Sequence, residues 1–221
     1  MIRAKAVKAA VVVVGLGLAM TAATTSAVAD SARPPAGVQV GIDLRGRPNP
    51  YQFLPRVRSF SLTSKTVRDG QPMPLDQKSG IFGVPGGKDI SPQLSWSGFP
   101  ADTKSFVVSM YDPEAPTGSG FWHWVVANIP ATTTSLPLGA GTPDSHLLPA
   151  GALQLNGDAG TPRYIGAAPP AGSGVHDYYL TVTALNVPSV DVTANTSGAL
   201  LGFTIDSHTV GRATLISPTR G

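Results

Sequence analysis

The chain has 221 residues, with 16 Lys and Arg, 13 Asp and Glu, and a formal net charge of +3. It contains no cysteine, which excludes disulfides, thiol catalysis, cysteine-ligated zinc and a cysteine-linked lipid anchor. The basic residues form no stripe or polybasic patch, so the sequence indicates no nucleic-acid partner.

Residues 1–29 have the pattern of a secretory signal peptide. A basic start with Arg3, Lys5 and Lys8 precedes the apolar run Ala9–Met20, and small residues follow up to position 29. The run is short for a spanning helix, which needs about 20 apolar residues; an uncleaved N-terminal anchor is the alternative. Without the leader, 13 Lys and Arg face 13 Asp and Glu, so no formal net charge remains. We expect a secreted or cell-envelope protein with no stable membrane span after leader removal.

The rest of the chain predicts a flexible N-terminal arm over residues 30–56 and one domain over residues 57–221. Short alternating or β-branched segments predict strands, and one segment predicts a weak helix. The predicted strands are 60–64, 94–97, 105–111, 122–129, 178–185 and 212–216, and the predicted helix is 196–203. Long connections without βαβ alternation predict an all-β fold with minor helix, an antiparallel sandwich of two facing sheets.

A first polar loop follows the strand at 105–111 and reads Asp112-Pro113-Glu114-Ala115-Pro116. The two prolines stiffen it, so Asp112 can be held in a cleft, or it can simply cap its own turn. The sharp reversal predicts a cis bond between Ala115 and Pro116. The following Gly118-Ser119-Gly120 can present backbone N–H groups to an anion, although such triplets are commonly flexible turns.

His123 lies between Trp122 and Trp124 in the next predicted strand. Strand alternation predicts that it faces away from both indoles, together with Val125 and Ile129. A hairpin would bring it close to the preceding carboxylate, whereas a core histidine bonded to a carbonyl is the plainer alternative.

A second loop, Pro169–His176, combines two prolines with Ala, Gly and Ser. His176 and Tyr178 share parity and would project the same way from the next strand. An ordinary strand entry with a surface histidine is the alternative. His146 and His208 have no comparable setting and are predicted to lie on the surface.

These motifs together resemble the phosphatidylethanolamine-binding protein family, also called the Raf kinase inhibitor-like family, in its bacterial branch. The matching segments are Asp89–Trp96 (DISPQLSW), the D-P-E-A-P turn with T-G-S-G-F-W-H-W, and the P-P-x-G…H-x-Y loop. The resemblance extends from about Phe60 to about Ile216.

The resemblance implies a large antiparallel sheet packed on a smaller one, with a small anion pocket at one end. The residues that match the family's pocket are Asp112, Glu114, His123, Pro170, Gly172, His176 and Tyr178. It also implies a ligand such as phosphate or a phospholipid head group, no cofactor and no agreed catalytic activity. The chain departs from the pattern at Gly166-Ala167-Ala168 and at Asp177, which replaces an Arg expected near the rim.

Two imidazoles beside a carboxylate suggest how such a pocket would work. Asp112 is expected to raise the pKa of a neighbouring histidine, so that His123 and His176 donate hydrogen bonds to a phosphate ester. Binding should then strengthen as the pH falls from ~7 to ~5.5.

Two other functions stay open at this point. Asp112, His123 and His176 could hold a metal in a hydrolase, or the surface around the pocket could inhibit a protease or kinase as a protein partner. A serine hydrolase is disfavoured, because the chain has no G-x-S-x-G and no Ser visibly beside a His–Asp pair.

Overall fold

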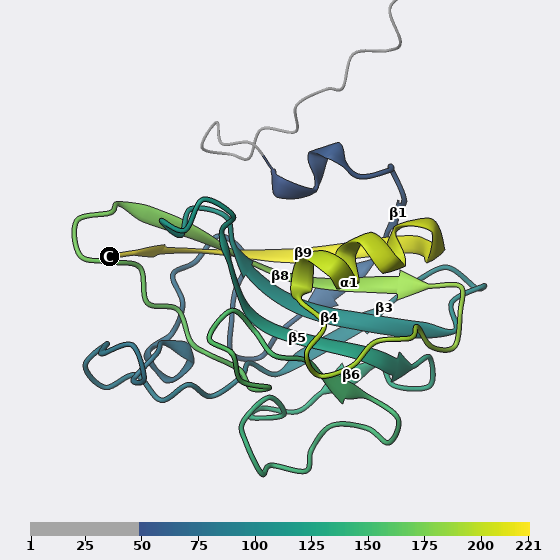
Figure 1. Cartoon of the computed structure of the whole chain (residues 1–221), viewed down its shortest axis with the longest axis horizontal. Coiled ribbons are helices and arrows are strands. Elements are labelled where there is room, and N and C mark those ends of the chain that lie inside the picture. The colour runs from purple at the N-terminus through teal and green to yellow at the C-terminus, as the bar shows by residue number, and fades with distance from the viewer. Residues whose placement is uncertain (1–48) are drawn as a thin grey trace, which may run out of the picture. The chain divides into compact units, whose positions relative to one another are not determined.

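The structure, a computed structural model, describes residues 49–221, whose strands form two sheets (Figure 1). The larger sheet has six strands in the spatial order β1 (Arg58–Ser59), β9 (Thr209–Arg220), β8 (Val175–Leu185), β4 (Ser105–Asp112), β5 (Phe121–Pro130) and β7 (Leu153–Gln154). The smaller sheet has three, in the order β2 (Ser61–Thr63), β3 (Leu94–Ser97) and β6 (Ser135–Leu136). One α-helix, α1 (Gly198–Ile205), and three 3-10 turns, η1 (Pro50–Phe53), η2 (Leu75–Gln77) and η3 (Asp206–His208), complete the described elements. The predicted leader and most of the predicted arm lie outside the described residues.

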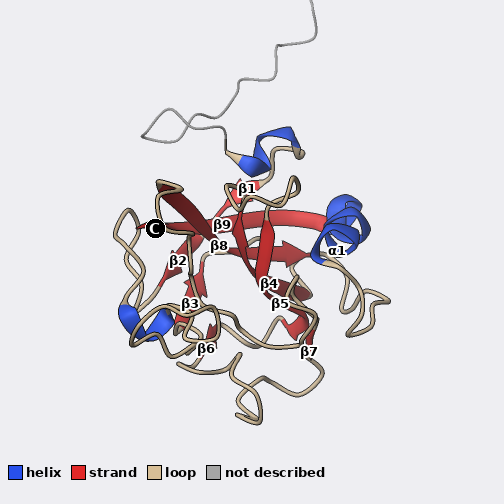
Figure 2. Ribbon diagram, turned by 60° about the vertical axis from the view of Figure 1, so that its left-hand side comes forward, coloured by secondary structure: helices blue, strands red, loops and turns tan. Residues whose placement is uncertain are grey.

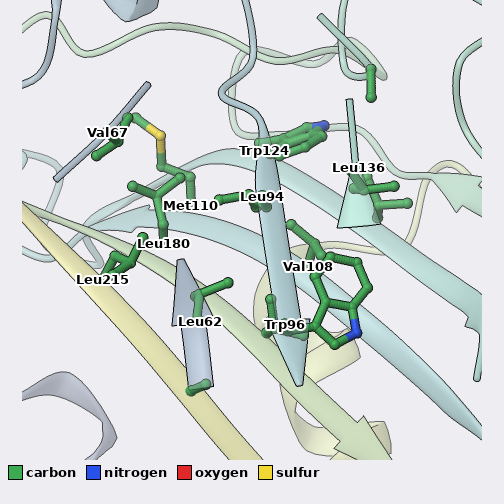
Figure 3. Close-up of a cluster of buried hydrophobic side chains, with 14 of the residues drawn as sticks. Leu62, Val67, Leu94, Trp96, Val108, Met110, Trp124, Leu136, Leu180 and Leu215 are labelled. Carbon is green, nitrogen blue, oxygen red and sulfur yellow. The ribbon is translucent and has the colours of Figure 1, made fainter. Parts of the chain in front are cut away.

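The main hydrophobic core lies between the two sheets. Alternation along β4 directs Phe106, Val108 and Met110 towards the smaller sheet, where they are fully buried. Figure 3 shows Met110 and Val108 close to Leu94, Trp96 and other side chains of this core. The predicted all-β arrangement of two facing sheets is confirmed.

The opposite face of the larger sheet carries a second, smaller core. Leu201 and Ile205 of α1 pack there with Val107 and Val125, and Figure 2 shows α1 on the side of the larger sheet away from β2, β3 and β6. None of the described helices is long and apolar enough to cross a membrane.

Several predicted boundaries need correction. The helix begins at Gly198 instead of Thr196, because the Ser197 side chain accepts from the Leu200 N–H and caps the first turn. The last strand runs from Thr209 to Arg220, much further than predicted, because β8 pairs with it along its whole length. Its first residues also pair with β1 in parallel, so the larger sheet is mixed rather than wholly antiparallel.

A bulge in β5 changes which side chains share a face. Met110 pairs with Trp124 and Tyr111 pairs with Trp122, which leaves His123 as the extra residue. Trp124 therefore enters the main core, while Trp122 lies on the outer face with its ring 4.5 Å from that of Tyr111. The prediction that both indoles share one face, opposite His123, is wrong for this reason.

A second irregularity, between Phe106 and Val108, separates the other predicted neighbours of His123. Ile129 joins the core between the sheets, whereas Val125 packs under α1. His123 itself lies on the side of the main core, where its ring contacts that of Tyr178.

Candidate functional site

A buried histidine–carboxylate pair lies where β4 ends and β8 begins. His176 Nδ1 is 2.7 Å from Asp112 Oδ2, and these residues are only 1% and 2% exposed. Asp112 Oδ1 also accepts the backbone N–H of Glu114 at 2.9 Å, so the carboxylate both caps its turn and holds the imidazole. Burial raises the pKa of the Asp112 carboxyl, and the hydrogen bond with His176 partly offsets this rise.

Ser173 completes the hydrogen bonds of His176. Its hydroxyl donates to the carbonyl oxygen of Pro170 at 2.7 Å and lies 2.8 Å from His176 Nε2. Because the hydroxyl hydrogen is used towards Pro170, Ser173 accepts from His176, so Nε2 carries a hydrogen. The other ring nitrogen, Nδ1, faces Asp112 Oδ2, so the two residues share a hydrogen in this buried pair.

Tyr178 lies beside this pair. Its hydroxyl oxygen accepts the Ala168 N–H at 3.2 Å and interacts with the Asp112 carboxyl. Burial raises the pKa of Tyr178 far above its ordinary value, so the phenol stays neutral and can donate its hydrogen.

His123 joins the same cluster from the bulge in β5. Its ring centroid is 5.2 Å from that of Tyr178 and 4.7 Å from that of Phe121. Nδ1 lies 3.1 Å from the carbonyl oxygen of Ile165 and must carry the hydrogen, because a carbonyl only accepts. Burial lowers the pKa of His123 to about 4, so Nε2 is an acceptor at neutral pH. The expectation of a raised pKa and a donating imidazole is wrong for this residue, because burial outweighs the opposing backbone hydrogen bonds at Ile165 and Gly166.

The neutral state of His123 predicts acid sensitivity. A histidine whose pKa falls from 6.5 to about 4 on folding takes up its proton more readily when unfolded, so stability drops as the pH falls through that window. We expect a loss of about 2 kcal/mol between pH 7 and pH 5 from this residue. The raised pKa of Asp112 acts in the opposite direction, at pH values above its ordinary value of 3.8.

Denaturant unfolding of the wild type and of His123→Gln at both pH values measures this effect. The variant should be less stable at pH 7 but should lose about 2 kcal/mol less on acidification. Equal losses in the two proteins would show that His123 does not titrate as described.

The remaining predicted site residues support the cluster from the two loops. Glu114 Oε2 accepts the Asp177 N–H at 2.9 Å and so ties the first loop to the second. Pro170 acts through its carbonyl oxygen, which also accepts the Ser173 N–H at 3.0 Å. Gly172 is exposed and has a φ of 78°, a backbone conformation that the turn requires and that favours glycine.

Two details of the loops differ from expectation. The predicted cis bond at Ala115–Pro116 is wrong, since no peptide bond within residues 49–221 is cis. The reversal is made instead by the Asp112 side chain and by a Thr117 N–H donating to the Ala115 carbonyl oxygen at 2.7 Å. Asp177 is fully buried, and alternation directs it away from the face of His176 and Tyr178, so it does not lie at the rim of the site.

The Gly118–Gly120 loop and the two remaining histidines, His146 and His208, lie as follows. Backbone carbonyl oxygens of the Gly118–Gly120 loop accept hydrogen bonds from the Tyr111 and Thr117 hydroxyls. That the N–H groups of this loop bind an anion stays a prediction. His146 is exposed and His208 is partly buried in η3.

Sequence reasoning missed residues that position the cluster. Ser173 was expected only as part of a pliable loop, and the statement that no Ser lies beside a His–Asp pair is wrong. Asp89 was also missed: Oδ1 accepts the Gly166 N–H at 2.7 Å, next to the carbonyl that holds His123, and Oδ2 accepts the Ile81 N–H at 3.0 Å. Its place at the head of the DISPQLSW motif was the available signal.

The metal alternative finds no support in the geometry. Between residues 49 and 221, no group of three or more His, Cys, Asp or Glu is arranged to hold a metal ion. His123 and His176 each direct Nδ1 to a protein acceptor, Ile165 and Asp112 respectively.

Comparisons with known proteins agree with this fold. The profile of the family described as phosphatidylethanolamine-binding protein matches residues 63–219. YbcL of Escherichia coli K12 is 44% identical over 161 residues, which cover 73% of this chain and 87% of YbcL. YbhB of the same strain is 46% identical over 156 residues, covering 71% of this chain and 97% of YbhB.

A solved structure and a more distant relative extend the comparison. The crystal structure of E. coli YbcL, described as a member of the mammalian PEBP family, superposes with a TM-score of 0.70 at 42% identity and covers 73% of this chain and 98% of that one. LppC of Mycobacterium tuberculosis H37Rv, whose name describes it as a lipoprotein, is 28% identical over 167 residues, or 76% of this chain and 75% of LppC. The predicted type of sandwich is therefore found in a solved relative.

Proposed function

Since the chain belongs to the phosphatidylethanolamine-binding protein family, we propose that the Asp112–His176 end of its larger sheet binds a small phosphate-bearing anion, such as inorganic phosphate or a phosphomonoester head group, without converting it. The observation that carries the proposal is that His176 and Tyr178 both contact the Asp112 carboxyl, while the ring of His123 packs against that of Tyr178. Such a fixed set of hydrogen-bonding groups suits recognition of one small polar ligand.

The hydrogen positions determine what kind of anion fits. The neutral Tyr178 phenol can donate a hydrogen bond to an anionic oxygen, while Nε2 of neutral His123 accepts a hydrogen bond. A ligand that is negative yet still carries one acidic hydrogen satisfies both groups. A phosphate monoester monoanion has that character, because its second pKa is about 6. The expected gain in affinity at lower pH thus comes from the ligand's proton rather than from protonation of His123.

The absence of turnover is part of the proposal, although Ser173, His176 and Asp112 form a chain of hydrogen bonds like that of a serine hydrolase. In this chain the imidazole donates to the serine, whose hydrogen is directed to the Pro170 carbonyl. A ring nitrogen that already holds a hydrogen cannot take the serine's proton, so the nucleophile is not activated.

Calorimetric titration with inorganic phosphate and with sulfate tests this selectivity. Sulfate lacks an acidic hydrogen at these pH values, so at pH 6 we expect phosphate to bind about tenfold more tightly, as one hydrogen bond to a charged group would give. Phosphate affinity should rise from pH 7.5 to pH 5.5 while sulfate affinity stays flat. His123→Phe retains a ring but removes the acceptor, so it should abolish the preference.

Equal binding of the two anions, or a preference that survives in His123→Phe, would contradict the ligand assignment. The claim of no turnover has a separate test. Incubation with a fluorophosphonate should leave Ser173 unmodified, and labelling at that residue would show an activated serine.

The proposed setting is outside the cytoplasm, in the envelope or the medium. It is supported by the signal-peptide pattern of residues 1–29 and by the similarity to LppC. A phosphate-bearing lipid head group would be available there.

A further inference from the structure

A groove lies on the outer face of the larger sheet, away from the phosphate site. It has a volume of about 870 Å³, within the range of pockets that hold small molecules. Its walls are η1 with the following residues up to Pro55 on one side and α1 with η3 on the other. Its floor includes Val107, Ser109 and Thr183, which project from β4 and β8. We call this feature the outer groove.

The floor of the outer groove joins the second core. Leu201 and Ile205 of α1 cover Val107 and Val125, but the same helix leaves open space at Gly202, where an added Cβ would meet no atom within 4 Å. An apolar chain can therefore lie beside α1 at this position without displacing packed side chains.

One end of the outer groove carries a positive charge. The Arg212 guanidinium lies 5.4 Å from the ring centroid of Tyr51, and within residues 49–221 no carboxylate is within 4.0 Å of it. Asp206, on the exposed rim, is the acidic group whose charge reaches Arg212. A guanidinium stays charged at all ordinary pH values, so this cation lacks a close anionic partner from the described chain.

The rim of the outer groove is unusually apolar. Phe53 and Phe203, which line it from η1 and α1, are 76% and 83% exposed. Exposed aromatic side chains beside a hollow commonly mark a binding site, because a bound apolar group removes them from water.

We propose that the outer groove binds a single-chain amphiphile with an anionic head group, such as a medium-chain fatty acid. The alkyl chain lies beside α1 along the apolar rim at Phe53 and Phe203, and the head group pairs with Arg212. The guanidinium suits this head group because it can make two parallel hydrogen bonds to a carboxylate or phosphate. Ser109 and Thr183 on the floor offer further polar contacts to the head group.

Titration of the full chain with laurate, below its micellar concentration, tests the proposal. Dodecanol has the same chain length without the charge and should bind about tenfold more weakly, as loss of one charged hydrogen-bonding pair would give. Dodecyl phosphate tests whether a phosphate head group can replace the carboxylate, and we expect it to bind about as tightly as laurate.

Two variants separate the charge from the apolar space. Arg212→Gln should weaken laurate about tenfold and leave dodecanol unchanged. Gly202→Trp should weaken both, since the new ring would project from an open position on α1 that tolerates a side chain. Thermal unfolding of each variant verifies that it is folded.

Excess inorganic phosphate should not compete with laurate, because its proposed site lies at the other face of the sheet. Undiminished laurate binding in Arg212→Gln, competition by phosphate, or equal binding of laurate and dodecanol would overturn the proposal. So would concentration-dependent dimerisation that closes the outer groove and excludes laurate, since the apolar rim would then serve a second copy of the chain.

Discussion

Replacing Asp112 with Ala should lower the free energy of unfolding by about 3–5 kcal/mol and abolish phosphate binding. The carboxylate is buried and accepts from His176 Nδ1 and from the Glu114 N–H, and it also interacts with the Tyr178 hydroxyl. Its loss leaves the Glu114 N–H and the Nδ1 side of His176 without their buried partner. Urea unfolding at pH 7 measures the loss, with the denaturant slope checked for a two-state transition.

Two controls show whether the effect belongs to the buried pair. Asp191→Ala changes an exposed carboxylate and should alter stability by less than about 0.5 kcal/mol. Asp112→Asn keeps the size and one acceptor oxygen, so its cost should be smaller than that of Asp112→Ala. A loss below about 1 kcal/mol for Asp112→Ala would contradict the assigned role of the pair.

A second large effect is expected from Gly166→Ala. A Cβ at this position would lie 2.5 Å from the Ser79 backbone nitrogen and 2.6 Å from the Gln77 carbonyl oxygen. Both are backbone atoms in a tight pairing of the two segments, so neither can move away cheaply. We expect a loss of about 3 kcal/mol, at the upper end of ordinary overpacking. Phosphate affinity should fall too, because Ile165 and Ala168, which hold His123 and Tyr178, flank this glycine.

Gly202→Ala provides the matched comparison for the same chemical change. Its Cβ would meet nothing within 4 Å, and the residue lies inside α1, where Ala is favoured over Gly by roughly 0.5–1 kcal/mol. This variant should be more stable than the wild type and should bind phosphate normally. If both substitutions changed the free energy of unfolding in the same direction, the backbone clash would not be the cause.

Much of the fold could be predicted from the sequence, because β4 and β8 carry long apolar and β-branched runs. The faces of β5 could not be predicted by alternation. A bulge adds one residue at His123 and inverts the pattern beyond it, and no single residue in FWHWVVANIP announces that shift. The same limit applies to β9, whose length is determined by pairing with β8 rather than by its own composition.

For the candidate site, the identities of several residues could be predicted from the sequence, but the positions of their hydrogens could not. The pairing of Asp112 with His176 follows from two loops at adjacent strand ends, and the sequence motifs point to both. The charge of His123 depends on its burial and on one carbonyl, that of Ile165, which lies 42 positions away. Ser173 contacts His176 only because the turn places its hydroxyl between Pro170 and His176. Such hydrogen-bond directions depend on three-dimensional contacts that spacing along the chain does not reveal.

The parallel contact between Ser59 and Arg212 joins segments more than 150 positions apart. Fixing such distant partners demands a large loss of chain entropy before any pairing energy is gained, so this protein should fold slowly for its size. β8 also lies between β4 and β9, so its second edge stays open until residues 209–220 have emerged from the ribosome. The phosphate receptor should therefore stay incomplete until β9, which follows β8 along the chain, is in place.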